Sequence, residues 1–287
     1  MNTVYRTAAI DGTEVFYRQA GSPSAPTIVL LHGFPSSSHQ YRNLIPQLAQ
    51  KYHVIAPDYP GFGHSAAPAD YSYTFDNYAR TIDGLLEHLG IQRYALYVFD
   101  YGAPVGFRLF AKHPERITAI VTQNGNAYVE GMGDFWTDVR AYWKTNAPAE
   151  REGIRWLTSL KATRWQYETG VPEDRRELVG PDGWQHDQSL MDRPGNADLQ
   201  LDVMFDYQTN PPLYPSWQQA FRDHQPPLLA VWGKNDQIFV APGAEAYRRD
   251  LPEAEIHLLD AGHFALESHG QEIADLMLDF LERKLPR

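Results

Sequence analysis

Short apolar runs of strand length alternate with helix-like stretches in the first half of this chain. The runs lie at residues 27–31, 53–56, 94–99 and 117–122, and they carry few polar residues. Continuous apolar runs are typical of strands buried on both faces, and the stretches between them have amphipathic helical spacing. The alternation therefore predicts an α/β protein whose mostly parallel sheet is covered by helices on both faces.

A hairpin precedes this pattern, and two further strands follow it. Residues 4–9 and 14–19 flank Asp11-Gly12, a dipeptide that favours a tight turn between antiparallel strands. The remaining strand-like runs are residues 227–232 and 255–259, and a closing helix is expected at about residues 267–285. These runs together predict eight strands.

The alternation is interrupted between residues 127 and 224, a segment rich in Trp, Tyr, Arg and Asp without a convincing strand. A helical insertion in an α/β sheet is best placed over the carboxyl edge, where such folds bind ligands. We therefore expect a core domain of residues 1–126 and 225–287, with residues 127–224 as a helical cap, or lid, inserted after the sixth strand. Its helices are expected near residues 134–144, 151–167 and 196–207, with loops at 180–183 and 210–212.

The segment around Asp100 carries the strongest chemical signal. The apolar run 94–99 ends at Asp100, and Gly102, Ala103 and Gly106 follow directly. Small residues after a sharp turn let the next helix lie close to the sheet, since Gly102 and Gly106 share one helical face. A side chain at the tip of such a turn stands above the sheet, beside the positive end of the helix. Asp100 is thus a candidate nucleophile, with an ordinary helix cap as the alternative.

Two other strand ends carry residues that complement Asp100. Asp236 follows the strand at 227–232, and His263 follows the last strand. Taken alone, Asp236 is consistent with a plain turn residue and His263 with a loop histidine. Together the three occur in the order nucleophile, acid and histidine that a hydrolytic triad on such a sheet requires. We therefore expect them to act together.

Five motifs in the same order give this chain a family resemblance. It resembles the α/β-hydrolase fold enzymes, and within them the branch with an aspartate nucleophile, the epoxide hydrolases and haloalkane dehalogenases. The resemblance spans nearly the whole chain, and one departure is Val98, where many members place a small residue. The motifs are His32-Gly33-Phe34-Pro35, Pro60-Gly-Phe-Gly-His-Ser65, Phe99-Asp-Tyr-Gly102, Trp232-Gly-Lys-Asn-Asp236 and Ala261-Gly-His263.

The resemblance implies a covalent mechanism. The carboxylate of Asp100 attacks an electrophilic carbon and forms an ester, which splits one difficult step into two. His263 then activates water against this ester, and Asp236 orients the imidazole and stabilises its protonated form. By resemblance, the backbone N–H groups of Phe34 and Tyr101 form the oxyanion hole. His32 is expected to shape the loop that carries Phe34.

The departing group distinguishes the two branches of this family. Dehalogenases hold a halide with N–H donors, commonly a tryptophan after the nucleophile, together with an asparagine after the His-Gly pair or a tryptophan in the lid. Here Tyr101 and Phe34 occupy the two core positions. The cap residues Trp136, Trp143 and Trp165 remain as possible donors, although packing is the commoner fate of such residues.

Epoxide hydrolases that resemble this chain protonate the ring oxygen with lid tyrosines. Tyr207 is our first candidate for this role, and Tyr142 is the second. The resemblance therefore implies an epoxide hydrolase that converts an epoxide and water to a vicinal diol without a cofactor. A haloalkane or haloacid dehalogenase is one alternative, and a non-catalytic ligand-binding protein on the same fold is another.

The composition of the chain limits the kinds of molecule that it is expected to bind. The net charge of −11 without a basic cluster argues against nucleic acid, and the absence of cysteine excludes disulfides and thiolate metal sites. The histidines outside the motifs do not form a metal-ligand pattern, so we expect no bound metal. Apolar runs are too short to cross a bilayer, and no signal segment is recognisable, so we expect a cytoplasmic protein. The expected partners are a small apolar electrophile and water, while the oligomeric state is left open.

Overall fold

The computed structural model describes residues 2–285 and contains a single sheet of eight strands in the order β1-β2-β4-β3-β5-β6-β7-β8. The first strand pairs antiparallel with β2, and β2 pairs antiparallel with β4. All other neighbours in the sheet are parallel, so the predicted mostly parallel eight-stranded sheet is confirmed. The strands are β1 Val4–Ile10, β2 Thr13–Ala20, β3 Thr27–Leu31, β4 His53–Pro57, β5 Tyr94–Phe99, β6 Ile117–Gln123, β7 Leu228–Gly233 and β8 Glu255–Leu259.

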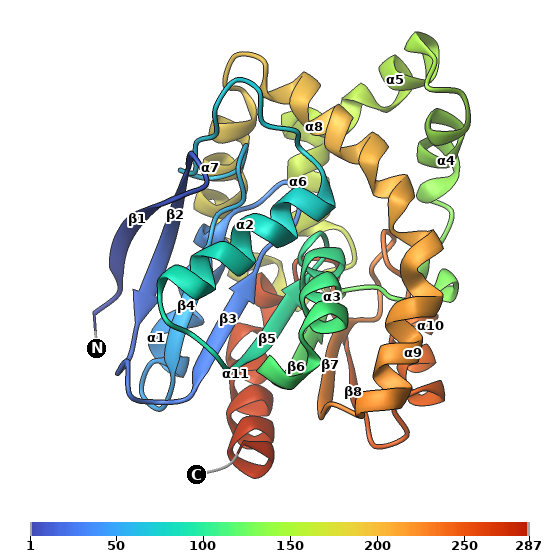
Figure 1. Ribbon diagram of the computed structural model, residues 1–287. Coiled ribbons are helices and arrows are strands. Elements are labelled where there is room, and N and C mark those ends of the chain that lie inside the picture. The colour runs from blue at the N-terminus through green and yellow to red at the C-terminus, as the bar shows by residue number, and fades with distance from the viewer. Residues whose placement is uncertain (1, 286–287) are drawn as a thin grey trace.

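Two hydrophobic clusters, one on each face of the sheet, hold the helices against it. Strand β3 shows the reason, because its residues are buried on both sides and alternate between the faces. Val29 and Leu31 join the cluster with α2 Phe75–His88 and α3 Gly102–Lys112. Ile28 and Leu30 join the cluster with the short α1 Ile45–Leu48 and with α11 Ala265–Lys284. Figure 1 shows α2 and α3 in front of the strands and α11 behind them.

The segment between β6 and β7 is helical, as expected, and most of it lies above the carboxyl edge of the sheet (Figure 1). The last helix of this segment, α9 Tyr214–His224, lies beside α3 instead. There Phe221 packs against Phe107 at 5.3 Å and Phe110 at 5.5 Å between ring centroids. We call the other helices the cap helices: α4 Trp136–Thr145, α5 Pro148–Ile154, α6 Leu160–Glu168, α7 Pro181–Met191 and α8 Asn196–Asp206.

Several element bounds differ from the sequence expectation. The expected loop at 180–183 begins α7, because Pro181 is at a first-turn position where its missing N–H leaves no helical bond unmade. The expected helix at 151–167 is two helices, since Ser159 caps α6 by accepting a hydrogen bond from the Ala162 amide. Of the helix-like stretches expected between the apolar runs, the one between β3 and β4 forms only the single turn α1, after a 3₁₀ turn at Ser38–Tyr41.

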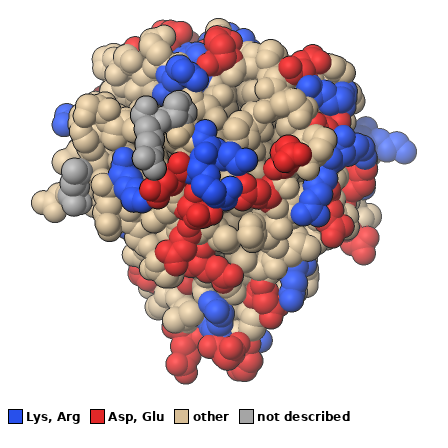
Figure 2. Space-filling view, turned by 90° about the horizontal axis from the view of Figure 1, so that it is seen from below, with Lys and Arg blue, Asp and Glu red and all other residues tan. Residues whose placement is uncertain are grey.

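The surface on the side away from the cap carries both signs of charge. Figure 2, which views the molecule from below, shows acidic and basic side chains interspersed over this face. Ion pairs such as Arg283 with Glu255 at 2.7 Å contribute to this pattern. Within residues 2–285 no helix is both long and apolar enough to cross a membrane.

Candidate active site

The turn between β5 and α3 holds Asp100 in a left-handed backbone conformation, with φ of 49°. Such a conformation is uncommon outside glycine and is strained, by roughly 1–3 kcal/mol. The following helix is held tightly, because a Cβ on Gly102 would overlap the carbonyl group of Leu31. A Cβ on Gly106 would lie 2.5 Å from Val98 Cγ1, so Gly106 makes the room that the larger residue at position 98 needs.

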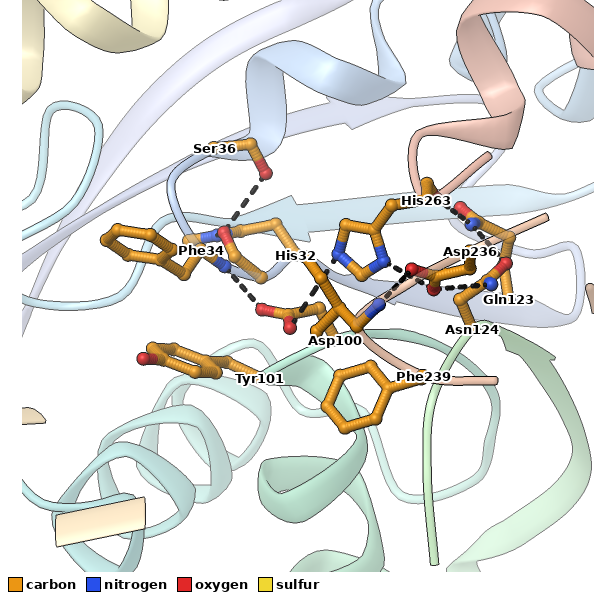
Figure 3. A network of polar contacts seen from close by, with 12 residues as sticks. His32, Phe34, Ser36, Asp100, Tyr101, Gln123, Asn124, Asp236, Phe239 and His263 are labelled. Carbon is orange, nitrogen blue, oxygen red and sulfur yellow. Dashed lines mark hydrogen bonds and ion pairs between the residues drawn. The ribbon is translucent and has the colours of Figure 1, made fainter. Parts of the chain in front are cut away.

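The structure brings Asp100, Asp236 and His263 together at the carboxyl edge of the sheet (Figure 3). His263 Nδ1 lies 2.7 Å from Asp236 Oδ2, a hydrogen-bond distance. On its other side, His263 Nε2 lies 3.8 Å from Asp100 Oδ2, too far for a hydrogen bond. The imidazole therefore lies between the two carboxylates, with Nε2 facing the candidate nucleophile.

The loop after β3 supplies a donor to Asp100. The backbone N–H of Phe34 donates to Asp100 Oδ1 at 2.6 Å, beside Gly33, whose Cα lies so close to the carboxyl group that a Cβ would overlap it. Ser36 Oγ donates to the Gly33 carbonyl at 3.0 Å and so fixes the loop from within (Figure 3). These contacts direct the Phe34 amide at the carboxylate.

His32 stabilises the same loop as a neutral imidazole. Its Nε2 accepts a hydrogen bond from the Tyr59 amide at 3.1 Å, which leaves Nδ1 to donate to the Gly33 carbonyl at 3.1 Å. Burial lowers the pKa of His32 to about 4, so the ring is uncharged at neutral pH. This geometry gives His32 the loop-shaping position expected from the sequence.

Electrostatics tune the two groups that face one another. Burial raises the pKa of Asp100 to about 6, although the His263 charge and the backbone amides of Phe34 and Tyr101 oppose the rise. For His263, burial lowers the pKa, but the negative charges of Asp236 and Asp100 outweigh it and leave the pKa raised. At neutral pH and above, Asp100 is therefore ionised in a dry site, the condition in which a carboxylate is a better nucleophile.

Tyr207 lies next to this set. Its side chain is fully buried, and its ring lies 4.6 Å from Trp136 and 5.7 Å from Tyr101 between centroids. Its hydroxyl has no hydrogen-bond partner of good geometry within residues 2–285. Burial raises the pKa of Tyr207 well above its ordinary value, and the neighbouring Tyr214 and the charge of Asp100 add to the rise. A buried hydroxyl beside the site and without a strong partner can serve as a proton donor.

Tyr142 does not join the site. Its hydroxyl accepts a hydrogen bond from Arg151 Nη1 at 2.8 Å, and the same nitrogen donates to the exposed Asp202 at 2.6 Å. Its ring packs on Phe205 at 5.0 Å instead. The next residue along α4, Trp143, is the one that stacks on Tyr207, because successive helical residues point in different directions.

Two of the three tryptophans considered as halide donors are engaged with backbone carbonyls. The indole N–H of Trp136 donates to the carbonyl of Ile238 at 2.8 Å, and that of Trp143 donates to the carbonyl of Met204 at 2.8 Å. The ring of Trp165 stacks on Phe135 at 6.0 Å. The indole N–H groups of Trp136 and Trp143 are thus already hydrogen-bonded within the protein.

Three residues around the histidine were not expected there from the sequence. Phe239 lies 6.1 Å from His263 between ring centroids, and Gln123 and Asn124 form hydrogen bonds to the His263–Asp236 pair. The sequence contains one signal for Gln123 and Asn124, which is their position. They follow the apolar part of β6, at the same carboxyl edge of the sheet as Asp100.

The fold, the sharp turn and the acid–histidine pair together define a class of hydrolase. Residues 26–270 match the family model described as the alpha/beta hydrolase fold. The chain belongs to this family, as the resemblance of its motifs implied, and it is a hydrolase of the α/β-hydrolase superfamily.

Comparisons with individual proteins show which members of the family this chain is similar to. Over 269 residues the chain is 48% identical to "Uncharacterized hydrolase YNR064C" of Saccharomyces cerevisiae, covering 92% of each chain. It is 36% identical over 115 residues to a haloalkane dehalogenase of Bradyrhizobium diazoefficiens, which covers 40% of this chain and 37% of that one. The solved structure of the epoxide hydrolase CorEH superposes with a TM-score of 0.78 at 21% identity, covering 98% and 99% of the two chains. At that identity the structural likeness establishes the fold alone.

Proposed function

We propose that this protein is an epoxide hydrolase that uses Asp100 as its nucleophile. The observation that carries the proposal is the position of Tyr207, whose buried ring lies 5.7 Å between centroids from that of Tyr101, the residue after Asp100. Its hydroxyl lies beside that of Tyr214 without a well-formed hydrogen bond. An opening epoxide develops negative charge on an oxygen that remains attached to the substrate. A proton donor opposite the nucleophile is therefore what this reaction needs.

In the first half-reaction, an oxygen of the Asp100 carboxylate attacks a ring carbon. The carbon–oxygen bond of the ring breaks, and its electron pair passes to the ring oxygen, which takes the proton of Tyr207. The product is an ester between Asp100 and the substrate, which now carries a hydroxyl on the adjacent carbon. Since Asp100 has a pKa of about 6, it is ionised for this step at neutral pH.

In the second half-reaction, His263 Nε2 takes a proton from water as the water oxygen attacks the ester carbonyl of Asp100. The backbone amides of Phe34 and Tyr101 stabilise the resulting oxyanion, a contribution of about 3 kcal/mol for one such donor. Asp236 stabilises the imidazolium at a hydrogen-bond distance of 2.7 Å. Collapse of the intermediate releases the vicinal diol as the leaving oxygen takes the proton held by His263. The other proton of the attacking water, now on the Asp100 carboxyl group, returns to Tyr207 and leaves Asp100 ionised.

A hydrolytic dehalogenase of haloalkanes or haloacids is the second candidate function. The specific observation in its favour is the match to a haloalkane dehalogenase over part of the chain. Against it, Trp136 and Trp143 already donate their indole N–H groups to backbone carbonyls, so neither is available to a departing halide. A binding protein without catalysis would have no use for the close acid–histidine pair.

The intact mass of a His263→Gln variant, incubated with epoxides and with haloalkanes, tests the proposal. Without its base the protein is expected to stop at the ester, so an epoxide should add its whole mass and the adduct should map to Asp100. A gain of the alkyl group alone from a haloalkane, with no epoxide adduct, would instead identify a dehalogenase. The matched control is Asp100→Ala combined with His263→Gln, which should gain nothing from either class.

A second measurement uses the Asp100→Ala variant alone. It should lose turnover of epoxides while it still binds the diol product, because only the attacking carboxylate is removed. Turnover that survives in this variant would refute Asp100 as the nucleophile. Absence of an adduct in the His263→Gln variant with both substrate classes would favour the non-catalytic alternative.

A further inference from the structure

Asn124 is held in an unusual conformation directly behind the acid–histidine pair. It is fully buried, and its backbone lies in the left-handed region with φ of 48°. It immediately follows β6, and its side chain points toward Asp236 (Figure 3). Residues in this conformation are held by their surroundings and tend to occur at functional sites.

The hydrogen bonds of Asn124 fix which way its amide group points. Its oxygen accepts from the Gly233 amide at 2.9 Å and from Gln123 Nε2 at 2.9 Å. Its nitrogen donates to Asp236 Oδ2 at 2.7 Å and to the Gly233 carbonyl at 3.3 Å. Two donors therefore face the oxygen and two acceptors face the nitrogen, so the opposite orientation would leave all four contacts unmade.

Asp236 is consequently held at both of its oxygens. Oδ1 accepts from the Ile238 amide at 2.7 Å, while Oδ2 accepts from both Asn124 and His263 Nδ1. A neutral amide donor stabilises the carboxylate without offering it a proton to exchange. It also prevents the carboxylate from rotating away when His263 becomes an imidazolium.

Gln123 holds the histidine from its backbone. Its Nε2 donates to the His263 carbonyl at 2.8 Å, and its Oε1 accepts from the Tyr97 hydroxyl at 3.2 Å. Two consecutive residues at the end of β6 thus contact both members of the acid–base pair. Neither residue contacts Asp100 through any hydrogen bond in residues 2–285.

We propose that Gln123 and Asn124 are positioning residues that orient the His263–Asp236 pair for hydrolysis of the Asp100 ester, and not for ring opening. This inference rests on the proposed epoxide hydrolase function. Ring opening needs only Asp100 and Tyr207, whereas ester hydrolysis needs His263 as a base. Loss of the Asn124 hydrogen bond therefore slows the second half-reaction selectively.

The test measures both half-reactions of Asn124→Asp in single turnover with an epoxide such as styrene oxide. Asp is nearly isosteric and tolerates the left-handed backbone, but it cannot donate to Asp236 Oδ2 and adds a negative charge beside it. Ester formation should stay within about twofold, while ester hydrolysis should slow by at least about tenfold, part of what a positioned general base contributes. The covalent adduct should then accumulate during turnover.

The pH profile provides a readout that a purely structural role would not change. His263 must be uncharged to act as a base, and the added carboxylate at position 124 raises its pKa. The rising limb of the hydrolysis rate should therefore move to higher pH in Asn124→Asp. In Asn124→Gly, which keeps the backbone conformation but adds no charge, hydrolysis should slow without this upward shift.

Gln188→Glu is the matched control, because Gln188 is also a buried amide but bonds within the cap, to the Thr163 hydroxyl and the Thr158 carbonyl. It should not change the ratio of the two half-reaction rates. Equal slowing of both half-reactions in the Asn124 variants, or an unchanged ratio, would overturn the positioning role. If Asn124→Asp fails to fold, Asn124→Gly decides the question by the same ratio.

The two proposals fail in different ways. Absence of an epoxide adduct in His263→Gln overturns the proposed function. An adduct in His263→Gln, together with no accumulation in either Asn124 variant, overturns the positioning role alone.

Discussion

At the scale of single residues, Asp100 combines two unfavourable conditions. Its backbone is left-handed, and its carboxyl group is 4% exposed, with burial as the main cause of a pKa of about 6. Each condition lowers the stability of the folded state and favours reactivity, a combination that is common at active sites. Both conditions agree with the proposed role of Asp100 as nucleophile.

Asp100→Asn should therefore stabilise the protein. The folded-state pKa of Asp100 is raised from 3.8, so ionisation disfavours the folded state, fully above about pH 6 and not at all below the unfolded value. Asn tolerates the same backbone conformation, so the free energy of unfolding should rise at about pH 8 by about 3 kcal/mol. Denaturant unfolding at two pH values measures this. A gain of equal size near pH 4 would show that the charge is not the cause.

Tyr207→Phe should separate activity from stability. The hydroxyl of Tyr207 lacks a well-formed hydrogen bond, so its removal should change the melting temperature little. Loss of the proton donor should slow ester formation from an epoxide by about a hundredfold or more. Tyr142→Phe is the comparison, since its hydroxyl bonds to Arg151 and its removal should have a far smaller effect on ester formation. Comparable slowing in the two variants would contradict this assignment.

At the scale of elements, the contact between β5 and α3 decides how Asp100 is presented. Gly106 packs directly on Val98, where the family resemblance leads one to expect a smaller residue. A large residue on the strand is thus matched by the absence of a side chain on the helix. The two positions are expected to be energetically coupled.

Gly106→Ala should destabilise the fold by about 1–3 kcal/mol through overpacking against Val98. Combined with Val98→Ala, which removes the opposing methyl groups, the loss should be smaller than the sum of the two single variants. Unfolding free energies of the four proteins form the double-mutant cycle that measures the coupling. Strict additivity would mean that helix α3 simply moves away from the sheet.

Sequence periodicity predicted the strands well and the cap helices less well, for a physical reason. Core strands such as β3 are short apolar runs that are buried on both faces, and the bounds of β3 matched the expectation. The cap helices pack on several sides, so a face cannot be chosen from spacing alone. This is why Tyr142 was expected in the site, although α4 directs Trp143 there instead.

The candidate triad was predictable because each member follows a strand of a parallel sheet, which fixes where its side chain is presented. Asn124 was not predictable in the same way. An amide after a strand has no chemical signature until the loop from Gly233 to Asp236 is brought beside it by pairing between β6 and β7. Roles that depend on such neighbours become visible only in three dimensions.

At the scale of the whole molecule, the site is closed. Asp100 and His263 are 4% and 2% exposed, so entry of a substrate requires the cap to move. Contacts between cap and core include Arg193 of the cap with the Gly63 carbonyl, at 2.8 Å. Another is the stack of His39 on His186 of α7, with 4.2 Å between ring centroids.

Opening of the cap should therefore depend on pH. Burial, together with the charges of His186, Arg42 and Arg18, lowers the pKa of His39 to about 4 from 6.5, while Asp182 opposes the shift. The closed state is favoured above about pH 6.5 and loses this preference as pH falls toward about 4, because the open state binds the proton more readily. Hydrogen exchange of α7 should be faster at about pH 5 than at pH 7.5, and less so in His39→Gln. Equal pH dependence in both proteins would exclude His39.

The donors that face Asp100 have a consequence for how this protein can diversify. They are main-chain amides of Phe34 and Tyr101, so substitution of either side chain leaves the donor in place. The rings of the same two residues lie 5.8 Å apart between centroids, beside Asp100. Natural or engineered substitutions of these two side chains can therefore change which molecules fit beside Asp100, while the backbone N–H donors remain in place.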